Sequence, residues 1–246
     1  MQPTAILSAL AQEQHGLIEQ LASPRQVNHA GRNFWLGDLH GQQVVLALSK
    51  IGKVAAATTA TALIERFGVQ RMVFTGVAGG LGQGVNVGDV VVAHDFVQHD
   101  LDASPLFARY EVPLYGKTRF DGDAALTTAL FEASCSALAE PQLRRAYPQA
   151  QAHRGLIASG DRFVSSAAEC SALREALLAA GHDVLAVEME GAAVAQVCHD
   201  YKIPFTAVRT ISDRADDSAH VDFPSFIDKV ASQYAHAIVE RFLKTL

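Results

Sequence analysis

The sequence predicts an α/β fold, a single-domain three-layer sandwich in which a mostly parallel, mixed and twisted sheet is flanked by helices. Short apolar runs rich in Val, Ile and Leu recur along the 246 residues, and stretches of helical length separate them. Strands that alternate with helices form sheets whose two faces are covered by helices. No stretch has the composition of a linker, so we expect one domain over residues 1–246.

The predicted strands are the apolar runs. Several of them lack a regular polar alternation, which is typical of strands that are buried on both faces. They cover residues 5–10, 44–48, 71–75, 90–93, 155–158, 184–187 and 205–211.

Four helices are predicted between and after these strands. Residues 54–67 are rich in Ala and stop before Gly68, a residue type that commonly follows a helix. Residues 167–180, which stop before Gly181, and residues 191–201 are the next two. The last helix is expected over residues 224–246, because apolar residues recur there at helical spacing and Pro224 suits a first turn.

Composition and charge exclude several classes of protein. The net charge is −6 and no run of Lys or Arg occurs, which argues against nucleic-acid binding. The apolar stretch over residues 5–10 has no basic start and is soon interrupted, so we expect no signal peptide, no membrane span and a cytoplasmic protein. Cys135, Cys170 and Cys198 show no CxxC spacing, which argues against zinc or disulfides, and we expect all three to be buried.

Polar residues follow the predicted strands where parallel strands would end together. Glu13 follows the first run, Gly-rich residues 76–80 follow the third, and residues 159–163, 188–190 and 212–213 follow later ones. Ligands bind at this edge of such sheets. Residues 76–80 lack the GxGxxG spacing of a dinucleotide site, so no cofactor is expected. The grouping indicates an acid/base site without a metal, although each acidic residue alone could be a helix cap.

Six segments together resemble a known family. They are residues 49–56 (SKIGKVAA), 75–81 (TGVAGGL), 87–92 (VGDVVV), 155–161 (GLIASGD), 186–191 (AVEMEG) and 208–213 (VRTISD). In order and spacing they resemble the methylthioadenosine/adenosylhomocysteine nucleosidases of the purine nucleoside phosphorylase superfamily. The resemblance implies hydrolysis of the N-glycosidic bond of an adenine nucleoside, a small-molecule substrate.

The resemblance also implies roles for the residues that carry charge. Asp213 would protonate N7 of adenine, with Ser212 orienting it. Glu13 would activate the attacking water, and Arg209 would lie near that water and keep Glu13 ionised. Glu190 would bind both ribose hydroxyls. Whether Asp213 gives up a full proton or only a hydrogen bond stays open at this point.

Further residues are implied to contact the substrate. Phe163 would stack on adenine while Val164 reads the base edge through its main chain, although Phe163 and Phe223 could also be ordinary core residues. The other implied contacts are Met189 against the sugar, Ile51 and Phe223 around the 5' substituent, and Val77, Ala78 and Gly79 of the Gly-rich turn.

Residues 99–123 have no single periodicity, and a loop of that length is usually functional or part of an interface. The apolar content of this loop predicts a homodimer. The resemblance implies that it closes the neighbouring subunit's pocket, with Phe107 and Tyr110 as lid residues.

Three other functions compete with this reading. They are a phosphate-dependent phosphorylase, a nucleosidase for another 6-aminopurine or a futalosine-type nucleoside, and a nucleoside-binding protein without activity. Phosphorylases of this fold carry Arg and Ser at places that resemble Phe74 and Val77, and the first loop here contains no Arg. Hydrolysis is therefore favoured, because a phosphate dianion needs cationic and hydroxyl partners.

Overall fold

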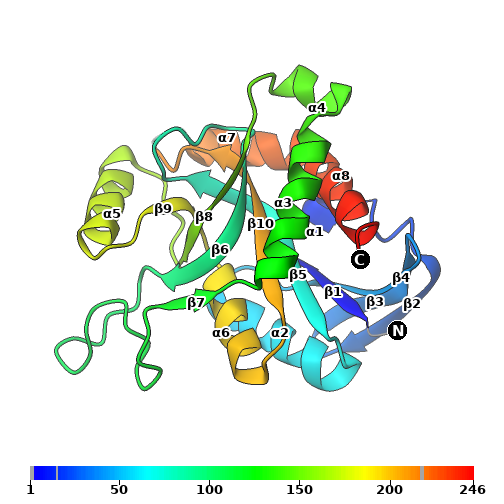
Figure 1. Cartoon of the computed structure of the whole chain (residues 1–246), viewed down its shortest axis with the longest axis horizontal. Helices are drawn as coiled ribbons and strands as arrows, with labels where there is room; N and C mark the ends of the chain where they lie inside the picture. Colours follow the sequence, from blue (N-terminus) through cyan, green and yellow to red (C-terminus); the bar gives the residue numbers. More distant parts are fainter. Residues whose placement is uncertain (1–2, 15, 217–218) are drawn as a thin grey trace.

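The strands form one twisted sheet with helices on both faces (Figure 1). The computed structural model describes residues 3–14, 16–216 and 219–246. The strands are β1 (Thr4–Ser8), β2 (Ala22–His29), β3 (Arg32–Leu39), β4 (Gln42–Leu48), β5 (Arg71–Gly80), β6 (Val90–Gln98), β7 (Arg119–Asp121), β8 (Ala152–Ser159), β9 (Val184–Glu188) and β10 (Phe205–Asp213). The α/β fold expected from the sequence is confirmed.

Strand β1 shows how both faces of the sheet are buried. It pairs in parallel with β4 on one side and β5 on the other. Ala5 and Leu7 pack into one hydrophobic cluster, and Ile6 between them packs into the other. The first cluster includes α2 (Lys53–Phe67) and α6 (Gly191–Tyr201), and the second includes α3 (Ala124–Leu138) and α8 (Ser232–Leu243). A strand covered on both sides needs apolar residues at every position.

The sheet curls back on itself around the strands that carry the polar residues. Strand β10 pairs with both β5 and β6, while β6, β8 and β9 pair in sequence and β9 returns to β5. In this last pairing Gly79 lies opposite Val187 and Gly80 opposite Ala186. The carboxyl ends of β5 and β9 therefore cross, and β10 ends beside them.

Three predicted helices are confirmed, with small shifts at their ends. Helix α2 ends before Gly68, whose φ of 62° is left-handed and whose N–H bonds to the carbonyl of Ile64. Helix α5 (Ala167–Ala179) and helix α6 cover the predicted ranges. Gly68 is therefore the glycine C-cap of helix α2, as the sequence predicted.

The predicted start of the last helix at Pro224 is wrong. Helix α7 (Ala219–Phe226) begins earlier and contains Pro224, and a π-helical turn, η1 (Ile227–Ala231), separates it from α8. Proline inside a helix has no N–H for the regular hydrogen-bond ladder. The ladder therefore changes register after Pro224, where the sequence pattern alone indicated one continuous helix.

Several elements were not predicted from the sequence. They are β2, β3, β7, α3, and the short helices α1 (Ala11–Gln14) and α4 (Pro141–Ala146). Strand β2 lies at the edge of the sheet and is almost entirely exposed, so its residues are polar and give no apolar run. Edge strands are the elements that apolar patterns identify least well.

The sequence also led to expectations about the cysteines and about membrane-spanning helices. Cys198 is buried and Cys170 half-buried, but Cys135 is exposed, so the expectation that all three cysteines are buried is wrong. Cys135 lies on the solvent-facing side of α3. Among the described residues, no helix is both long and apolar enough to cross a bilayer.

The loop between β6 and β7 projects away from the body of the molecule (Figure 1). Leu106 and Leu114 on it are 84% and 92% exposed, and Phe107 is half-buried. Tyr110, in contrast, is 1% exposed and packs against Leu81 and other core residues of its own subunit. The expectation that Tyr110 is a lid residue is therefore wrong, because its ring has no surface left to offer a partner.

Candidate active site

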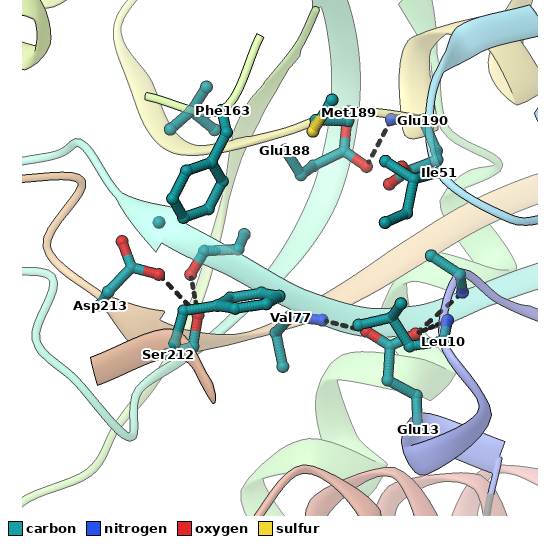
Figure 2. Close-up of a pocket in the computed structure, with 15 residues that line it drawn as sticks. Leu10, Glu13, Ile51, Val77, Phe163, Glu188, Met189, Glu190, Ser212 and Asp213 are labelled. Atoms are coloured by element: carbon teal, nitrogen blue, oxygen red, sulfur yellow. Dashed lines mark hydrogen bonds between the residues drawn. The ribbon is translucent and has the colours of Figure 1, made fainter. Parts of the chain in front are cut away.

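A cavity with about 470 Å³ of empty space opens at the crossing of β5, β9 and β10 (Figure 2). Most of the residues predicted for substrate contact line it: Glu13, Ile51, Val77, Ala78, Gly79, Phe163, Met189, Glu190, Ser212, Asp213 and Phe223. Ala9, Leu10, Val187 and Glu188 complete the lining. Val164 lines a smaller adjoining hollow, whereas Phe107 and Tyr110 lie outside the cavity.

Asp213 and Ser212 lie at one end of the cavity, where β10 stops (Figure 2). One carboxyl oxygen of Asp213 accepts a hydrogen bond from the Ser212 hydroxyl at 2.8 Å, and the other accepts from the Ala215 N–H at 2.8 Å. Asp213 is 2% exposed. Gly79 allows this approach, because a Cβ there would lie 3.1 Å from a carboxyl oxygen of Asp213.

Glu13 lies at the other end, on the short helix α1 (Figure 2). Its carboxylate accepts hydrogen bonds from the N–H groups of Ala9 at 2.8 Å, Leu10 at 2.9 Å and Val77 at 3.2 Å. Burial raises the pKa of Glu13, although these hydrogen bonds and the charge of Arg209 pull it down. A carboxylate with a raised pKa is a stronger base than an exposed one.

Glu190 immediately precedes helix α6 and is 5% exposed. One of its oxygens accepts the N–H of Gly52 at 2.9 Å, which ties it to the loop before α2. Gly52 has a φ of 97°, a conformation that favours glycine. Burial, and the nearby negative charge of Glu188, raise the pKa of Glu190 to about 8.

Arg209 is buried behind the cavity and does not pair with Glu13 as expected. Its ion pairs among the described residues are with Glu188, at 2.5 Å, and Glu190, at 3.9 Å. The guanidinium also lies over the ring of Phe74, 4.1 Å from the ring centre. The structure therefore corrects the expected pairing, because the end of β9 places Glu188 closer to the guanidinium than Glu13.

Gly76 lets Glu13 and Arg209 come close to each other. A Cβ at this position would lie 2.6 Å from a terminal nitrogen of Arg209 and 2.9 Å from a carboxyl oxygen of Glu13. Both distances are far shorter than carbon can tolerate, so both charged groups lie against the bare backbone of β5. The Gly-rich turn therefore serves close approach of side chains rather than phosphate binding.

The aromatic residues of the site are not core residues. Phe163 is 46% exposed at the cavity, and its ring meets that of Phe223 edge-on, with centres 5.5 Å apart. Ile51 is 55% exposed on the opposite wall. Large apolar side chains left open to solvent around one cavity form a surface that a planar, apolar ligand can cover.

Four residues that hold the site together were not among the site residues chosen from the sequence, although Ser159, Glu188 and Gly76 lie in the segments that follow the predicted strands and Glu188 was an alternative to Glu190. They are Ser159, Glu188, Gly52 and Gly76. Glu188 follows a predicted strand directly, as the chosen residues do, so its position was the available signal. In the part of the chain that the structure describes, no three His, Cys, Asp or Glu side chains are grouped to hold a metal ion.

The raised pKa of Glu190 predicts how stability depends on pH. The folded protein keeps this proton at pH values where the unfolded chain, with the ordinary value of 4.5, has released it. The stabilisation that protonated Glu190 contributes to the folded state is therefore fully present below pH 4.5 and is lost as the pH rises through about 8. Glu190→Gln should flatten that decline in thermal unfolding measured from pH 4 to 9. Substitution of exposed Glu132 by Gln should leave the decline as it is, and an identical decline in both variants would contradict the assignment.

Comparison with known proteins shows the family of this chain. The family model of the phosphorylase superfamily matches residues 3–244. The 5'-methylthioadenosine/S-adenosylhomocysteine nucleosidases of Bacillus thuringiensis (strain Al Hakam) and Bacillus anthracis are each 36% identical over 236 residues, covering 96% of both chains.

Solved structures agree with the sequence comparison. The nucleosidase of Neisseria meningitidis in complex with methylthio-immucillin-A matches with a TM-score of 0.88 and 36% identity, covering 100% of both chains. Futalosine hydrolase of Helicobacter pylori matches with a TM-score of 0.86 and 31% identity, covering 100% of this chain and 98% of that one. Because both the family model and these relatives span nearly the whole chain, this protein belongs to the phosphorylase superfamily and, within it, to the 5'-methylthioadenosine/S-adenosylhomocysteine nucleosidases.

Proposed function

We propose that this chain hydrolyses the N-glycosidic bond of an adenine nucleoside, with 5'-methylthioadenosine and S-adenosylhomocysteine as its substrates. The relatives named above carry this activity in their names. The products are adenine and a ribose with its 5' thio substituent. We propose that residues 1–246 act as one catalytic domain and that the protein works in the cytoplasm.

The acidic lining of the cavity carries this proposal. Four of its lining residues are acidic, namely Glu13, Glu188, Glu190 and Asp213, and none of those described is Lys, Arg or His. The nearest guanidinium, that of Arg209, is 1% exposed and already paired with Glu188. A phosphate dianion would enter without a cationic partner, at a high desolvation cost. Neutral water meets no such barrier, so hydrolysis is favoured over phosphorolysis.

Asp213 is proposed as the group that assists departure of the base. Its placement beside Phe163 and Val164 would bring its carboxyl group to N7 of an adenine stacked on Phe163. Protonation at N7 makes adenine a better leaving group when the bond between C1' and N9 breaks. The Ser212 hydroxyl, which donates to Asp213, orients the carboxyl group.

Glu13 is proposed as the general base for water. Three backbone N–H groups fix its carboxylate at the end of the cavity away from Asp213. The water would form the new bond to C1' and give its proton to Glu13 as the sugar passes through a cationic state. Asp213 and Glu13 would then act at opposite ends of the sugar. This arrangement suits a water that attacks C1' from the side opposite the departing adenine.

Glu190 is proposed to bind the two ribose hydroxyls. One carboxyl oxygen is already held by Gly52, and the cavity borders the residue, with Met189 beside it. Leu10, Ile51, Val77 and Phe223 line the cavity with apolar side chains, which suits a thioether substituent. These residues would distinguish 5' substituents by shape and polarity.

The first test separates hydrolase from phosphorylase. Methylthioadenosine incubated with the protein in phosphate-free buffer should release adenine and methylthioribose at the same rate as with excess phosphate. Adenosylhomocysteine, adenosine and a futalosine-type nucleoside complete the substrate panel. A rate that requires phosphate, or a sugar product that carries a 1-phosphate, would contradict the proposal.

The second test addresses the acid and the base. Glu13→Gln and Asp213→Asn should each lower kcat by about 10²–10⁴-fold, because each removes one proton transfer and leaves the shape of the side chain unchanged. Asp183→Asn, on the exposed surface, is the matched control and should keep wild-type turnover. Circular dichroism checks that each variant is folded. Near wild-type kcat in either site variant would remove that residue from the mechanism.

We further propose that the protein is a homodimer in which the loop between β6 and β7 lies against the second copy. Leu106 and Leu114 on this loop, and Val54 at the start of α2, are 84%, 92% and 79% exposed. Side chains of this kind are costly to leave in water when they gather in one region. Phe107, a half-buried residue of this loop, is the residue proposed to approach the partner's cavity.

Light scattering at micromolar concentration tests the dimer. The wild type should have twice the mass of one chain, and Leu114→Asp together with Leu106→Asp should shift it toward the monomer. Leu178→Asp, an exposed leucine on α5, is the control and should leave the mass unchanged. A fully active wild-type monomer would refute the proposal.

A further inference from the structure

Glu188 lies at the centre of a hydrogen-bonded cluster that the proposed mechanism does not use. Its side chain is buried at the end of β9. It accepts hydrogen bonds from the Ser159 hydroxyl, from the Gly191 N–H at 2.9 and 3.0 Å, and from the Glu190 N–H at 3.2 Å. Arg209 donates to it at 2.5 Å. These donors fix the position of the carboxylate.

Two neighbours further restrict the guanidinium of Arg209. One terminal nitrogen pairs with Glu188, and the other lies against Gly76, where a carboxyl oxygen of Glu13 also approaches. The ring of Phe74 covers a face of the group. Glu13 receives its hydrogen bonds from backbone N–H groups instead, and within the described residues no ion pair joins it to Arg209.

We propose that Glu188 is a positioning residue of the catalytic centre, which pairs with the guanidinium of Arg209 and keeps it from forming an ion pair with Glu13, so that Glu13 remains a base. This inference rests on the proposed hydrolysis with Glu13 as the base. Glu188 acts on Glu13 through Arg209, and Glu13 is the residue that takes the proton from water. Ser159 supports it by donating to Glu188 and accepting from the Ala192 N–H, which joins β8 to the start of α6.

Glu188, Glu190 and Glu13 all interact with the buried guanidinium of Arg209. Among the described residues, Glu188 interacts with the charged or titratable groups of Arg209 on β10, Glu190 before α6 and His99 after β6, and Arg209 in turn interacts with Glu13 on α1. Without the negative charge of Glu188, the full charge of Arg209 acts on Glu13 and Glu190. Both would then hold their protons less firmly, and Glu13 would take a proton from water less readily.

The pH dependence of kcat/KM distinguishes this role from simple support of the fold. In Glu188→Gln, which keeps the size of the side chain, the acid limb should move to lower pH by about one to three pH units. The same variant should lose about tenfold or more in kcat, since the base is weaker. Glu188→Asp keeps the charge, so its acid limb should stay at the wild-type position even if kcat falls. Glu132→Gln on exposed α3 should match the wild type throughout. An unmoved limb in Glu188→Gln would overturn the proposal.

Thermal unfolding as a function of pH reports the ionisation of Glu190 and needs no catalytic turnover. The wild type should lose stability as the pH rises through about 8, where Glu190 ionises, and in Glu188→Gln the loss should occur at lower pH. A wild type that does not hydrolyse nucleosides would refute the proposed function, while an unmoved stability decline in Glu188→Gln would count against the inference in either case.

A paired substitution covers the case in which Glu188→Gln does not fold. Glu188→Gln together with Arg209→Met leaves no unpaired buried charge, a replacement that proteins often tolerate. Glu13 then lacks its nearby cation, so the acid limb should move to higher pH than in the wild type. A limb at the wild-type position would show that the pair does not act on Glu13, and would overturn the proposal.

Discussion

The ion pair between Arg209 and Glu188 is the interaction on which the rest of the site depends. A guanidinium that is 1% exposed must be neutralised within the protein, because water cannot reach it. The partner comes from β9, which meets β10 only because the sheet closes around β5. The pairing of β9 and β10 with β5 therefore brings the neutralising carboxylate to this buried charge.

This closure explains why glycines gather at the end of β5. Gly76 lies against Arg209 and Glu13, and Gly79 lies against Asp213 and the side chain of Val187. A side chain at either position would separate groups that the site requires to be close. Glycine has a cost in a strand, since it adds no packing and loses more entropy on folding. Glycine is nevertheless needed here, because the bare backbone of β5 forms one wall of the cavity.

The cavity combines two environments that the chemistry needs in one place. Phe163, Phe223 and Ile51 provide apolar surface, and Glu13, Glu190 and Asp213 provide carboxyl groups at separate points around it. Burial of acidic groups in such surroundings raises their affinity for protons, as the pKa of Glu190 shows. Excess negative charge also favours a cationic sugar in the transition state and disfavours phosphate. The same lining thus bears on both the rate and the type of reaction.

The sequence by itself determined the fold class, the central strands and most of the cavity residues. Strands such as β1 and β10 are buried on both faces, so their apolar runs are visible without a structure. Residues that follow those runs, such as Glu13 and Asp213, could be placed at one edge because parallel strands end together. Strand β2 could not be predicted, because an exposed edge strand carries no apolar pattern.

Only the tertiary structure decided how the charges pair and which side chains are accessible. The family resemblance implied that Arg209 lies near Glu13, and the crossing of β5 and β9 makes Glu188 its partner. Tyr110 belongs to an irregular loop, yet its ring enters the core of its own subunit. Pairing and burial depend on distances between segments far apart in the chain. Local patterns of residues carry no information about those distances, and the closed sheet sets them.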